Sequence, residues 1–531
     1  MAWRDIEIAR EFLASETGPI VRDWGGRVPI ALIYANSYAV GMSSLAIHGL
    51  YQHLNALPGL VVERAFAWLD RRPRADTPVL TLESQQSIAE AAVVAASLSF
   101  EMDYFNLVAM LRRAQIPLRA EERDEGDPLV LLGGPAVSAN PMPLSPLADA
   151  TLIGEIEPIL EPLGQVLAEM VIHSREETLD ALARIPGLYV PQRHRGEPVL
   201  RQHLANLDAY PTGTAIVAPR AEFGDLHLVE LSRGCGHGCR FCLAGRWYRP
   251  YRERSLDSIL EQVQQGPPEL SRVGLVSAAA SDYTRVDELA STLQEMGYEL
   301  SVSSLRIRPL APALVDALAR TGSRSITLAP EAGSERLRQL IRKGITHDDI
   351  LQATELVKGR FASLKLYFMI GLPMEEDKDI DEILSLVGQV RERFERQVVV
   401  NLTPFVPKAH TPWERMPMAP APVLEERMSR LREGCRRLRV ELRAEAVSAA
   451  HVQGVLARGD ARVGEALLNM RNPTPGRFER ALADAGLSME EELAAREPEE
   501  PLPWDWVRVV APRDPRETAI QSCPPGEPDH D

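Results

Sequence analysis

The stretch Arg233-Gly234-Cys235-Gly236-His237-Gly238-Cys239-Arg240-Phe241-Cys242 contains three of the five cysteines of the chain, in the spacing C-x3-C-x2-C. Thiolates at this spacing can bind three irons of a [4Fe–4S] cluster and leave the fourth iron without a protein ligand. Such an open iron can chelate a small molecule and pass it an electron. The glycines between the cysteines favour a tightly wound loop whose sulfurs turn inward.

Zinc is the alternative metal for this loop, with His237 or a distant group as the fourth ligand. No second C-x2-C pair follows, and His237 lies between the cysteines rather than at a usual ligand offset. The spacing therefore favours an iron–sulfur cluster. Cys435 and Cys523 stand alone in the sequence, and we expect each to be a structural or surface thiol.

Cys235, Cys239 and Cys242, with the aromatic Phe241 directly before the last cysteine, resemble the signature of the radical S-adenosylmethionine (SAM) superfamily. The resemblance implies that the open iron chelates SAM and that reductive cleavage yields methionine and a 5′-deoxyadenosyl radical. That radical would remove a hydrogen atom from a substrate. The resemblance further implies that Phe241 lies against the adenine and that a donor such as flavodoxin or ferredoxin supplies the electron.

The composition is that of an ordinary globular protein. The 531 residues are enough for about three or four domains, with 45% hydrophobic and 25% charged residues. The net charge of −16 does not favour nucleic acid as a partner, although a local basic patch stays open. The first residues lack a secretory apolar core, no apolar run is long enough to span a bilayer, and the cysteines cluster as for metal. These features predict a cytoplasmic protein with no membrane partner.

Strand and helix patterns alternate through residues 28–172, after an N-terminal helix and linker at 1–27. Such alternation predicts an α/β fold with a doubly wound parallel sheet. Its ligand crevice should lie beyond the carboxyl ends of the strands. The strand candidates are Val28–Tyr34, Ala92–Leu98, Leu129–Leu132 and Ala150–Gly154.

This part resembles the cobalamin-binding-like domain that precedes many radical SAM barrels. By that resemblance, Ser97 and Ser99 after one strand, and Gly133 and Gly134 after the next, would surround the nucleotide tail of cobalamin. The segment Gly154-Glu155-Ile156-Glu157 resembles the Gly-Glu turn that often closes the domain.

One departure from the family bears on cobalamin. The Asp-x-His-x-x-Gly motif, which supplies a histidine to cobalt in the family, is missing, and Asn36–Met42 stands in its place. His48 follows inside a predicted helix at about 42–56, and we expect it on the helix surface rather than on cobalt. Whether the domain binds cobalamin stays open.

A second strand–helix repeat fills residues 221–415, after a proline-rich connector at 173–220. The cysteine loop follows the first strand of the repeat at its carboxyl end, where (β/α) barrels place their chemistry. Six strands match the partial (β/α)6 barrel of radical SAM enzymes. They are Leu226–Leu231, Arg272–Ser277, Leu300–Ile307, Ser325–Ala329, Leu364–Ile370 and Val398–Thr403. Residues 416–531 read as a helical region with an acidic, proline-rich tail.

Polar residues after the barrel strands are the candidate SAM contacts. By resemblance, Arg306 at the end of the third strand and Glu331 after the fourth would approach SAM. Gly371, with Pro373, would shape the floor under the adenine. Glu331 and Ser334 also precede a predicted helix, and the alternative role for each is to satisfy free N–H groups of that helix.

Two further stretches lie near the predicted site. Residues Arg246–Arg254 interleave four arginines with three aromatics, which suits either nucleic-acid stacking or a salt-bridged loop over the cluster, and we favour the loop. The prolines of Pro404–Trp413 make a stiff segment near the barrel mouth, where Lys408 and His410 would face substrate or take an ordinary surface role.

The motifs Pro407–Pro412, Ala457–Arg462 and Leu502–Asp505 resemble an uncharacterised radical SAM family with a cobalamin-binding-like N-terminal domain. Three interpretations of function follow. The first is a SAM-cleaving enzyme that carries out cobalamin-dependent methyl transfer. The second is a radical enzyme that modifies RNA or protein without methyl transfer, and the third is a non-catalytic iron–sulfur or zinc scaffold. The substrate is not indicated by the sequence.

Overall fold

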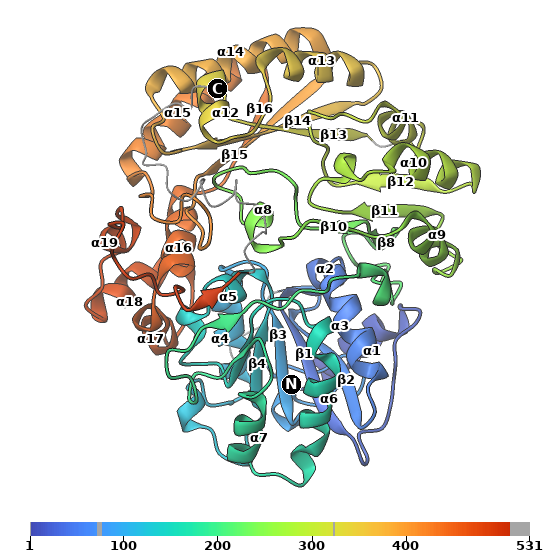
Figure 1. The fold of residues 1–531 in the computed structure, drawn as a ribbon, viewed down its shortest axis with the longest axis vertical. Coiled ribbons are helices and arrows are strands. Elements are labelled where there is room, and N and C mark those ends of the chain that lie inside the picture. The colour runs from blue at the N-terminus through green and yellow to red at the C-terminus, as the bar shows by residue number, and fades with distance from the viewer. Residues whose placement is uncertain (1, 72–76, 322–323, 510–531) are drawn as a thin grey trace.

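A computed structural model describes residues 2–71, 77–321 and 324–509 (Figure 1). An α/β domain built from the N-terminal part lies below an open barrel, and helices of the C-terminal part lie beside both (Figure 1). Cys523 and the end of the predicted acidic tail fall outside the described residues. No helix in the described part of the chain is both long and apolar enough to cross a membrane.

The N-terminal domain contains the predicted doubly wound sheet. Its strands lie in the order β2-β1-β3-β4-β5-β6, all parallel except the pairing of β6 with β5. The strands are β1 (Val28–Ser37), β2 (Leu60–Trp68), β3 (Val93–Ser97), β4 (Leu129–Gly133), β5 (Ala150–Leu152) and β6 (Leu188–Tyr189). Because the chain winds outward in both directions from β1, the topological switch lies between β1 and β3, where a ligand crevice is expected.

Strand β2 was not predicted, because Glu63 and Arg64 interrupt its apolar run. Both side chains are buried in the sheet and paired. The Arg64 guanidinium lies 2.7 Å from both Glu16 and Glu83, and the Glu63 carboxylate accepts a hydrogen bond from Trp24 at 2.8 Å. Buried charges with this many partners are compatible with a central strand.

Helices cover both faces of the sheet, so alternate residues of β1 face different cores. Ile30 and Leu32 belong to the core formed with α1 (Ala2–Ala14), α3 (Leu45–Ala56), α6 (Leu160–Ala168) and α7 (Arg175–Leu182). Ala31 and Ile33 face the opposite core, which contains α4 (Asp103–Arg113).

The barrel consists of two parallel sheets. The first has the order β12-β11-β8 and the second the order β13-β14-β15-β16, and a single parallel bridge between Leu305 and Leu328 joins them. The strands are β8 (His227–Glu230), β11 (Arg272–Val276), β12 (Glu299–Val302), β13 (Ser325–Glu331), β14 (Ser363–Ile370), β15 (Gln397–Pro404) and β16 (Glu441–Ala444). Within the described residues β8 and β16 do not pair, so the barrel is open.

The six predicted barrel strands are present, and β16 is a seventh. The prediction of a purely helical region after residue 416 is wrong at one place, because α15 (Ala421–Arg437) ends and β16 follows. Helices connect the strands, as the predicted strand–helix repeat requires. They are α9 (Leu256–Gln264), α10 (Val286–Glu295), α11 (Pro312–Arg320), α12 (Glu335–Leu340), α13 (His347–Val357) and α14 (Asp377–Phe394).

The C-terminal helices pack against the N-terminal domain as well as the barrel. These helices are α16 (Val447–Arg458), α17 (Ala461–Asn469), α18 (Phe478–Asp484) and α19 (Met489–Leu493). The rings of Phe105 on α4 and Phe478 on α18 meet edge to face at 5.4 Å. Arg119 forms an ion pair with Glu465 on α17 at 2.7 Å. One continuous apolar cluster therefore runs from α4 into the C-terminal helices and the barrel.

Candidate functional site

The cysteine loop leaves the barrel at the carboxyl end of β8, as predicted. The short strand β9 (Ser232–Arg233) leads into the loop, and β10 (Arg252–Glu253) pairs with it antiparallel after the loop returns. Gly234 has φ +90°, and a Cβ there would lie 2.6 Å from the Tyr248 carbonyl oxygen, so only glycine fits. Gly236 and Gly238 have no such constraint.

The three thiols of the loop form a donor set suited to a metal cluster. Cys239 is buried, whereas Cys235 and Cys242 are half-buried, and no disulfide joins them in the described chain. Burial raises the pKa of the Cys239 and Cys242 thiols, and each also feels the charge of a neighbouring cysteine. Thiolates that interact in this way repel one another, and bound iron would supply the compensating positive charge.

His237 is one of the two kinds of fourth ligand considered for a zinc site at this loop. The ligand atoms of Cys235, His237 and Asp282 lie within 4.8 Å of one another. The Nε2 atom of His237, however, lies 2.7 Å from an Asp282 carboxylate oxygen. Asp282 in turn lies 3.7 Å from the Arg306 guanidinium, so the structure joins the predicted Arg306 to the cysteine loop through two side chains.

Glu331 lies at the carboxyl end of β13 and faces the cysteine loop. Its carboxylate forms an ion pair with Lys343 at 2.8 Å, and both groups act electrostatically on the Cys239 thiol. The N-cap of α12 is instead Ser334, whose hydroxyl accepts a hydrogen bond from the Leu337 N–H. Of the two roles considered for Glu331, capping therefore belongs to Ser334. Lys343 was missed because it stands in a loop after α12 with no motif around it.

Phe241 and Gly371 lie on the apolar side of the loop. Phe241 packs against an apolar cluster that includes Met369 of β14. Gly371 has φ +75°, and a Cβ there would lie 2.6 Å from Leu424. The Gly371 N–H donates to the Glu375 carboxylate at 2.6 Å, which fixes the turn after β14. Burial raises the pKa of Glu375 to about 7.

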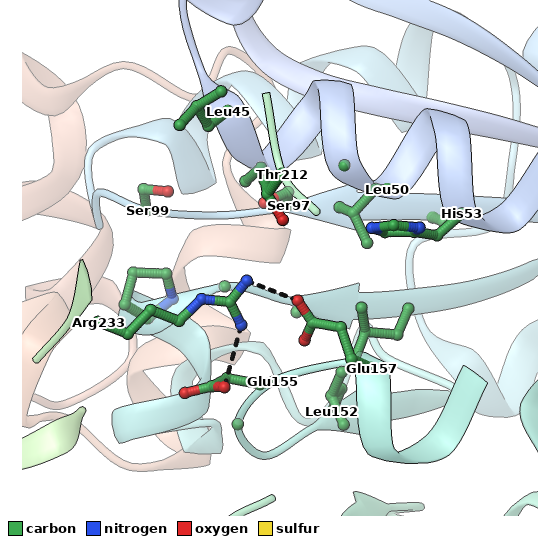
Figure 2. Close-up of a pocket in the computed structure, with 18 of the residues that line it drawn as sticks. Leu45, Leu50, His53, Ser97, Ser99, Leu152, Glu155, Glu157, Thr212 and Arg233 are labelled. Atoms are coloured by element: carbon green, nitrogen blue, oxygen red, sulfur yellow. Dashed lines mark hydrogen bonds and ion pairs between the residues drawn. The ribbon is translucent and has the colours of Figure 1, made fainter. Parts of the chain in front are cut away.

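A cavity of about 450 Å³ lies between the N-terminal sheet and the barrel (Figure 2). Its floor is the sheet face covered by α3 and α6, and its other end reaches the cysteine loop at Gly234. The predicted Ser97, Ser99, Gly133 and Gly134 all line it.

The two cavity glycines differ in the space around them. Gly134 has φ +100°, and a Cβ there would lie within 2.8 Å of the Leu98 backbone, so the position requires glycine. A Cβ at Gly133 would meet only Leu152, at 3.9 Å. Gly133 therefore leaves room inside the cavity that a side chain would occupy.

Polar groups that the sequence did not point out also line the cavity. Figure 2 shows Arg233 between Glu155 and Glu157, and His53 on α3 at the opposite side. The Nε2 atom of His53 is buried and has no hydrogen-bond partner in the described structure, and burial lowers the pKa of this imidazole.

His48 does not lie on the helix surface, as was expected from the sequence. It is 1% exposed, its Nε2–H donates to the Met42 carbonyl at 3.0 Å, and its Nδ1 accepts from the Ala215 N–H at 3.2 Å. It therefore ties α3 to the connector, and it does not line the cavity.

The arginine-rich stretch after the loop is salt-bridged, as one part of the favoured interpretation requires. Arg252 contacts Glu155 through two nitrogens, at 2.7 and 2.9 Å, and Arg254 lies 2.5 Å from Glu230. Both arginines are buried, so neither is available to phosphate groups of a nucleic acid.

Lys408 and His410, after β15, also have internal partners. Lys408 lies 2.5 Å from Glu101 of the N-terminal domain. His410 contacts the Ala139 carbonyl at 3.0 Å and packs against the Trp247 ring. Both side chains join the two halves of the molecule, which is neither of the roles considered for them.

Comparison with known proteins gives two family matches. The model of the radical SAM superfamily matches residues 229–387, and that of "Radical SAM proteins, N-terminal" matches residues 46–191. An uncharacterised protein of Methanocaldococcus jannaschii, MJ0966, is 30% identical over 455 residues, which cover 84% of this chain and 92% of that protein.

More distant relatives match part of the chain. A tRNA-2-methylthio-N(6)-dimethylallyladenosine synthase of Aquifex aeolicus is 27% identical over 220 residues, 39% of this chain and 49% of that enzyme. Among solved structures, the radical SAM methyltransferase TsrM of Kitasatospora setae aligns with a TM-score of 0.47 at 16% identity, covering 71% of this chain and 72% of that one. The cobalamin-dependent radical SAM enzyme OxsB aligns with a TM-score of 0.48 at 14% identity, covering 68% and 52%.

Proposed function

Because the chain belongs to the radical SAM superfamily, we propose that it is an enzyme that holds a [4Fe–4S] cluster on Cys235, Cys239 and Cys242 and cleaves SAM. When bound, the cluster supplies the electron that splits SAM into methionine and a 5′-deoxyadenosyl radical. The observation that carries the proposal is the presence of three free thiols on one loop at the carboxyl end of β8. Barrels of this kind place their reactive groups at that end.

The chain provides groups of suitable chemistry around the loop for SAM. The cationic Arg306 and Lys343 suit the carboxylate of the methionine part, and Glu331 suits its amine or the ribose hydroxyls. Phe241 offers an apolar ring for the adenine, and the turn at Gly371 lies next to the same apolar cluster. These residues would bind and orient SAM, whereas the cluster provides the chemistry.

Anaerobic reconstitution tests this function. The purified chain is supplied with iron and sulfide, reduced with dithionite and incubated with SAM. We expect about four irons per chain, the content of one such cluster, and release of 5′-deoxyadenosine. Zinc in place of iron, or a loaded cluster that leaves SAM intact, would contradict the proposal and favour the scaffold interpretation.

We further propose that the cavity holds part of a cobalamin, which would make the enzyme a methyltransferase for an unidentified substrate. Supporting this, the cavity opens at the β1/β3 switch point, is mostly apolar, and is lined by Ser97, Ser99, Gly133 and Gly134. Its volume of about 450 Å³ suits a group of the size of the nucleotide tail, whereas a whole cobalamin is larger than the cavity. Binding of hydroxocobalamin but not of cobinamide, which lacks the tail, is the expected result.

Modification of RNA without methyl transfer is the second candidate. It is favoured by the similarity to tRNA methylthiolating enzymes. The match covers only about half of the length of the related enzyme. Against it, Arg252 and Arg254 are buried in ion pairs, and the net charge is −16. SAM-derived methyl transfer that requires cobalamin would separate the two candidates, as would RNA that co-purifies with the chain.

A further inference from the structure

The loop that carries the cluster cysteines is attached to the N-terminal domain through Arg233. Its Nη1 lies 3.0 Å from Glu155 and its Nη2 lies 2.6 Å from Glu157, both in the turn that follows β5. Its Nε lies 2.8 Å from Glu230, at the end of β8. Every nitrogen of this guanidinium is therefore paired, only two residues before Cys235.

Strand β10, which pairs with β9 after the cysteine loop, is bound to one of the same carboxylates. Arg252 on β10 holds Glu155 through two hydrogen bonds, and Arg201 of the connector lies 3.5 Å from the same carboxylate. Burial raises the pKa of Glu155, but the hydrogen bonds and charges of Arg252 and Arg233 outweigh this and lower the pKa to about 2. The strands on both sides of the cysteine loop are thus fixed to the N-terminal domain by buried ion pairs.

The same junction forms a wall of the cavity. Glu155, Glu157 and Arg233 line it, facing Ser97 and Ser99 across the space (Figure 2). Glu157 forms its ion pair with Arg233 at 2.6 Å. A ligand that fills the cavity therefore meets Glu157 and Arg233 directly.

The charges of the junction indicate what kind of ligand suits it. Ion pairs within the described residues link four guanidinium groups with three carboxylates, so one positive charge is uncompensated. Arg233 uses three of its five N–H groups in these pairs, which leaves two for a ligand. Away from this wall the cavity is lined mainly by apolar side chains such as Leu32, Leu50 and Leu152.

We propose that Arg233 is a positioning residue that transmits the occupancy of the cavity to the cluster loop, and that the occupant is a mainly apolar ligand with an anionic group. The inference rests on the proposed function, because it requires a cluster on the loop. Ion pairs are strong and directional where water is excluded. A ligand anion that draws Arg233 away from Glu157 shifts β9, and with it Cys235. Cobalamin, whose tail contains a phosphodiester, is one ligand of this class.

The test compares the cluster with the cavity empty and filled. Reconstituted, reduced protein with SAM is studied by electron paramagnetic resonance, with and without hydroxocobalamin as the probe. Glu157→Gln keeps the shape of the side chain but weakens its pairing with Arg233. Glu176→Gln is the matched control, because Glu176 pairs with Arg193 on the exposed side of α7 in the same domain.

We expect cobalamin to change the cluster spectrum of the wild type and of Glu176→Gln. In Glu157→Gln cobalamin should still bind, with an affinity within about threefold of wild type, while the spectrum no longer responds. A response in Glu157→Gln equal to that of wild type would overturn the inference, as would bound cobalamin that leaves the wild-type spectrum unchanged.

If the wild type takes up no cobalamin, Glu157→Gln is itself the test, because it loosens Arg233 from residue 157 as the ligand anion would. Its cluster spectrum should then differ from that of wild type and of Glu176→Gln, and an identical spectrum would overturn the inference. Failure of the proposed function would be detected separately. In that case the wild-type chain would bind fewer than about four irons, or it would not cleave SAM.

Discussion

The Glu331 carboxylate lies 2.8 Å from the Lys343 ammonium group, beside the cysteine loop. The two side chains are only 15% and 10% exposed, so each charge is largely removed from water and is compensated by the other. Lys343 follows α12, whereas Glu331 ends β13 with φ +69°. The pair joins two successive barrel elements at the place where we expect the methionine part of SAM.

Replacing Lys343 with methionine should weaken the binding of SAM more than the binding of the cluster. The change leaves Glu331 without its cation and removes one of the two cations proposed for the SAM carboxylate. We expect KM for SAM to rise about tenfold, a loss near 1.4 kcal/mol, while iron content stays near four per chain. Lys358→Met is the control, because Lys358 pairs with Glu395 at the exposed end of α13. Unchanged KM would exclude Lys343 from the SAM site.

Single replacement of Cys235, Cys239 or Cys242 with alanine should remove the visible absorption of the cluster and SAM cleavage. In the proposed site three thiolates would hold the cluster, and no other described cysteine lies on the loop. Cys435→Ala should keep both properties, because Cys435 is buried in the core around α15. The assignment is wrong if the single variants retain about four irons per chain.

The sequence predicted the parts of the site that depend on local pattern. The cysteine spacing, the strand before it, and the positions of Arg306, Glu331 and Gly371 after barrel strands follow from motifs and from the alternation of elements. Strand β16 was missed, because four largely exposed residues that follow a helix lack a strand pattern.

Contacts between residues far apart in the sequence could not be predicted in the same way. Glu155 was noted for its turn, but its pairing with Arg252 and Arg233 depends on how the two domains meet. His53 lies one turn from the end of α3, and its sequence neighbours do not reveal that its Nε2 is buried without a partner. The sequence predicts His48 on the surface of a helix, but in the structure the connector covers it.

Stability should fall as the pH decreases from about 6.5 to 4, in part because of His48. Burial lowers the pKa of His48 to about 4, against an ordinary value of 6.5. A base whose pKa is lowered on folding stabilises the fold while it is neutral, and this stabilisation is lost as the pH falls through 6.5 toward 4. Protonation would also remove the acceptor for the Ala215 N–H.

The expected contribution of His48 to the free energy of unfolding is on the order of 3 kcal/mol at neutral pH. Thermal unfolding of wild type and His48→Gln, measured between pH 7.5 and pH 4, tests it. Glutamine can donate to Met42 and accept from Ala215 without titrating, so its melting temperature should depend less steeply on pH. Parallel pH curves for the two proteins would show that His48 is not responsible.

Cutting the chain near residue 200 should not give two independent domains. The proline-rich connector suggests such a cut, but α4 packs its Phe105 ring against Phe478, and Arg119 pairs with Glu465. A fragment of residues 1–200 would expose this face, so we expect it to aggregate, and co-expression with residues 201–531 should restore it. A monodisperse fragment in size-exclusion chromatography that unfolds cooperatively would contradict this expectation.

Filling the cavity at Gly133 should abolish cobalamin binding. Gly133→Leu places a side chain in the space proposed for the nucleotide tail, whereas the methyl group of Gly133→Ala meets only Leu152, at 3.9 Å. We expect the alanine variant to bind cobalamin and the leucine variant to bind none, with equal melting temperatures for both. Equal uptake by the two variants would place the tail elsewhere.

The cobalt of a bound cobalamin should carry no protein imidazole on its lower face. Asn36–Met42 stands where the family has its cobalt-binding histidine, and the Asn36 amide is engaged with Asp103 at 2.8 Å. Cobalt would then be five-coordinate or bind water, which favours giving up a methyl group. Paramagnetic resonance of the cob(II)alamin state should show no nitrogen splitting. If splitting is seen, His53 is the described histidine that lines the cavity, and loss of the splitting in His53→Ala would identify it as the ligand.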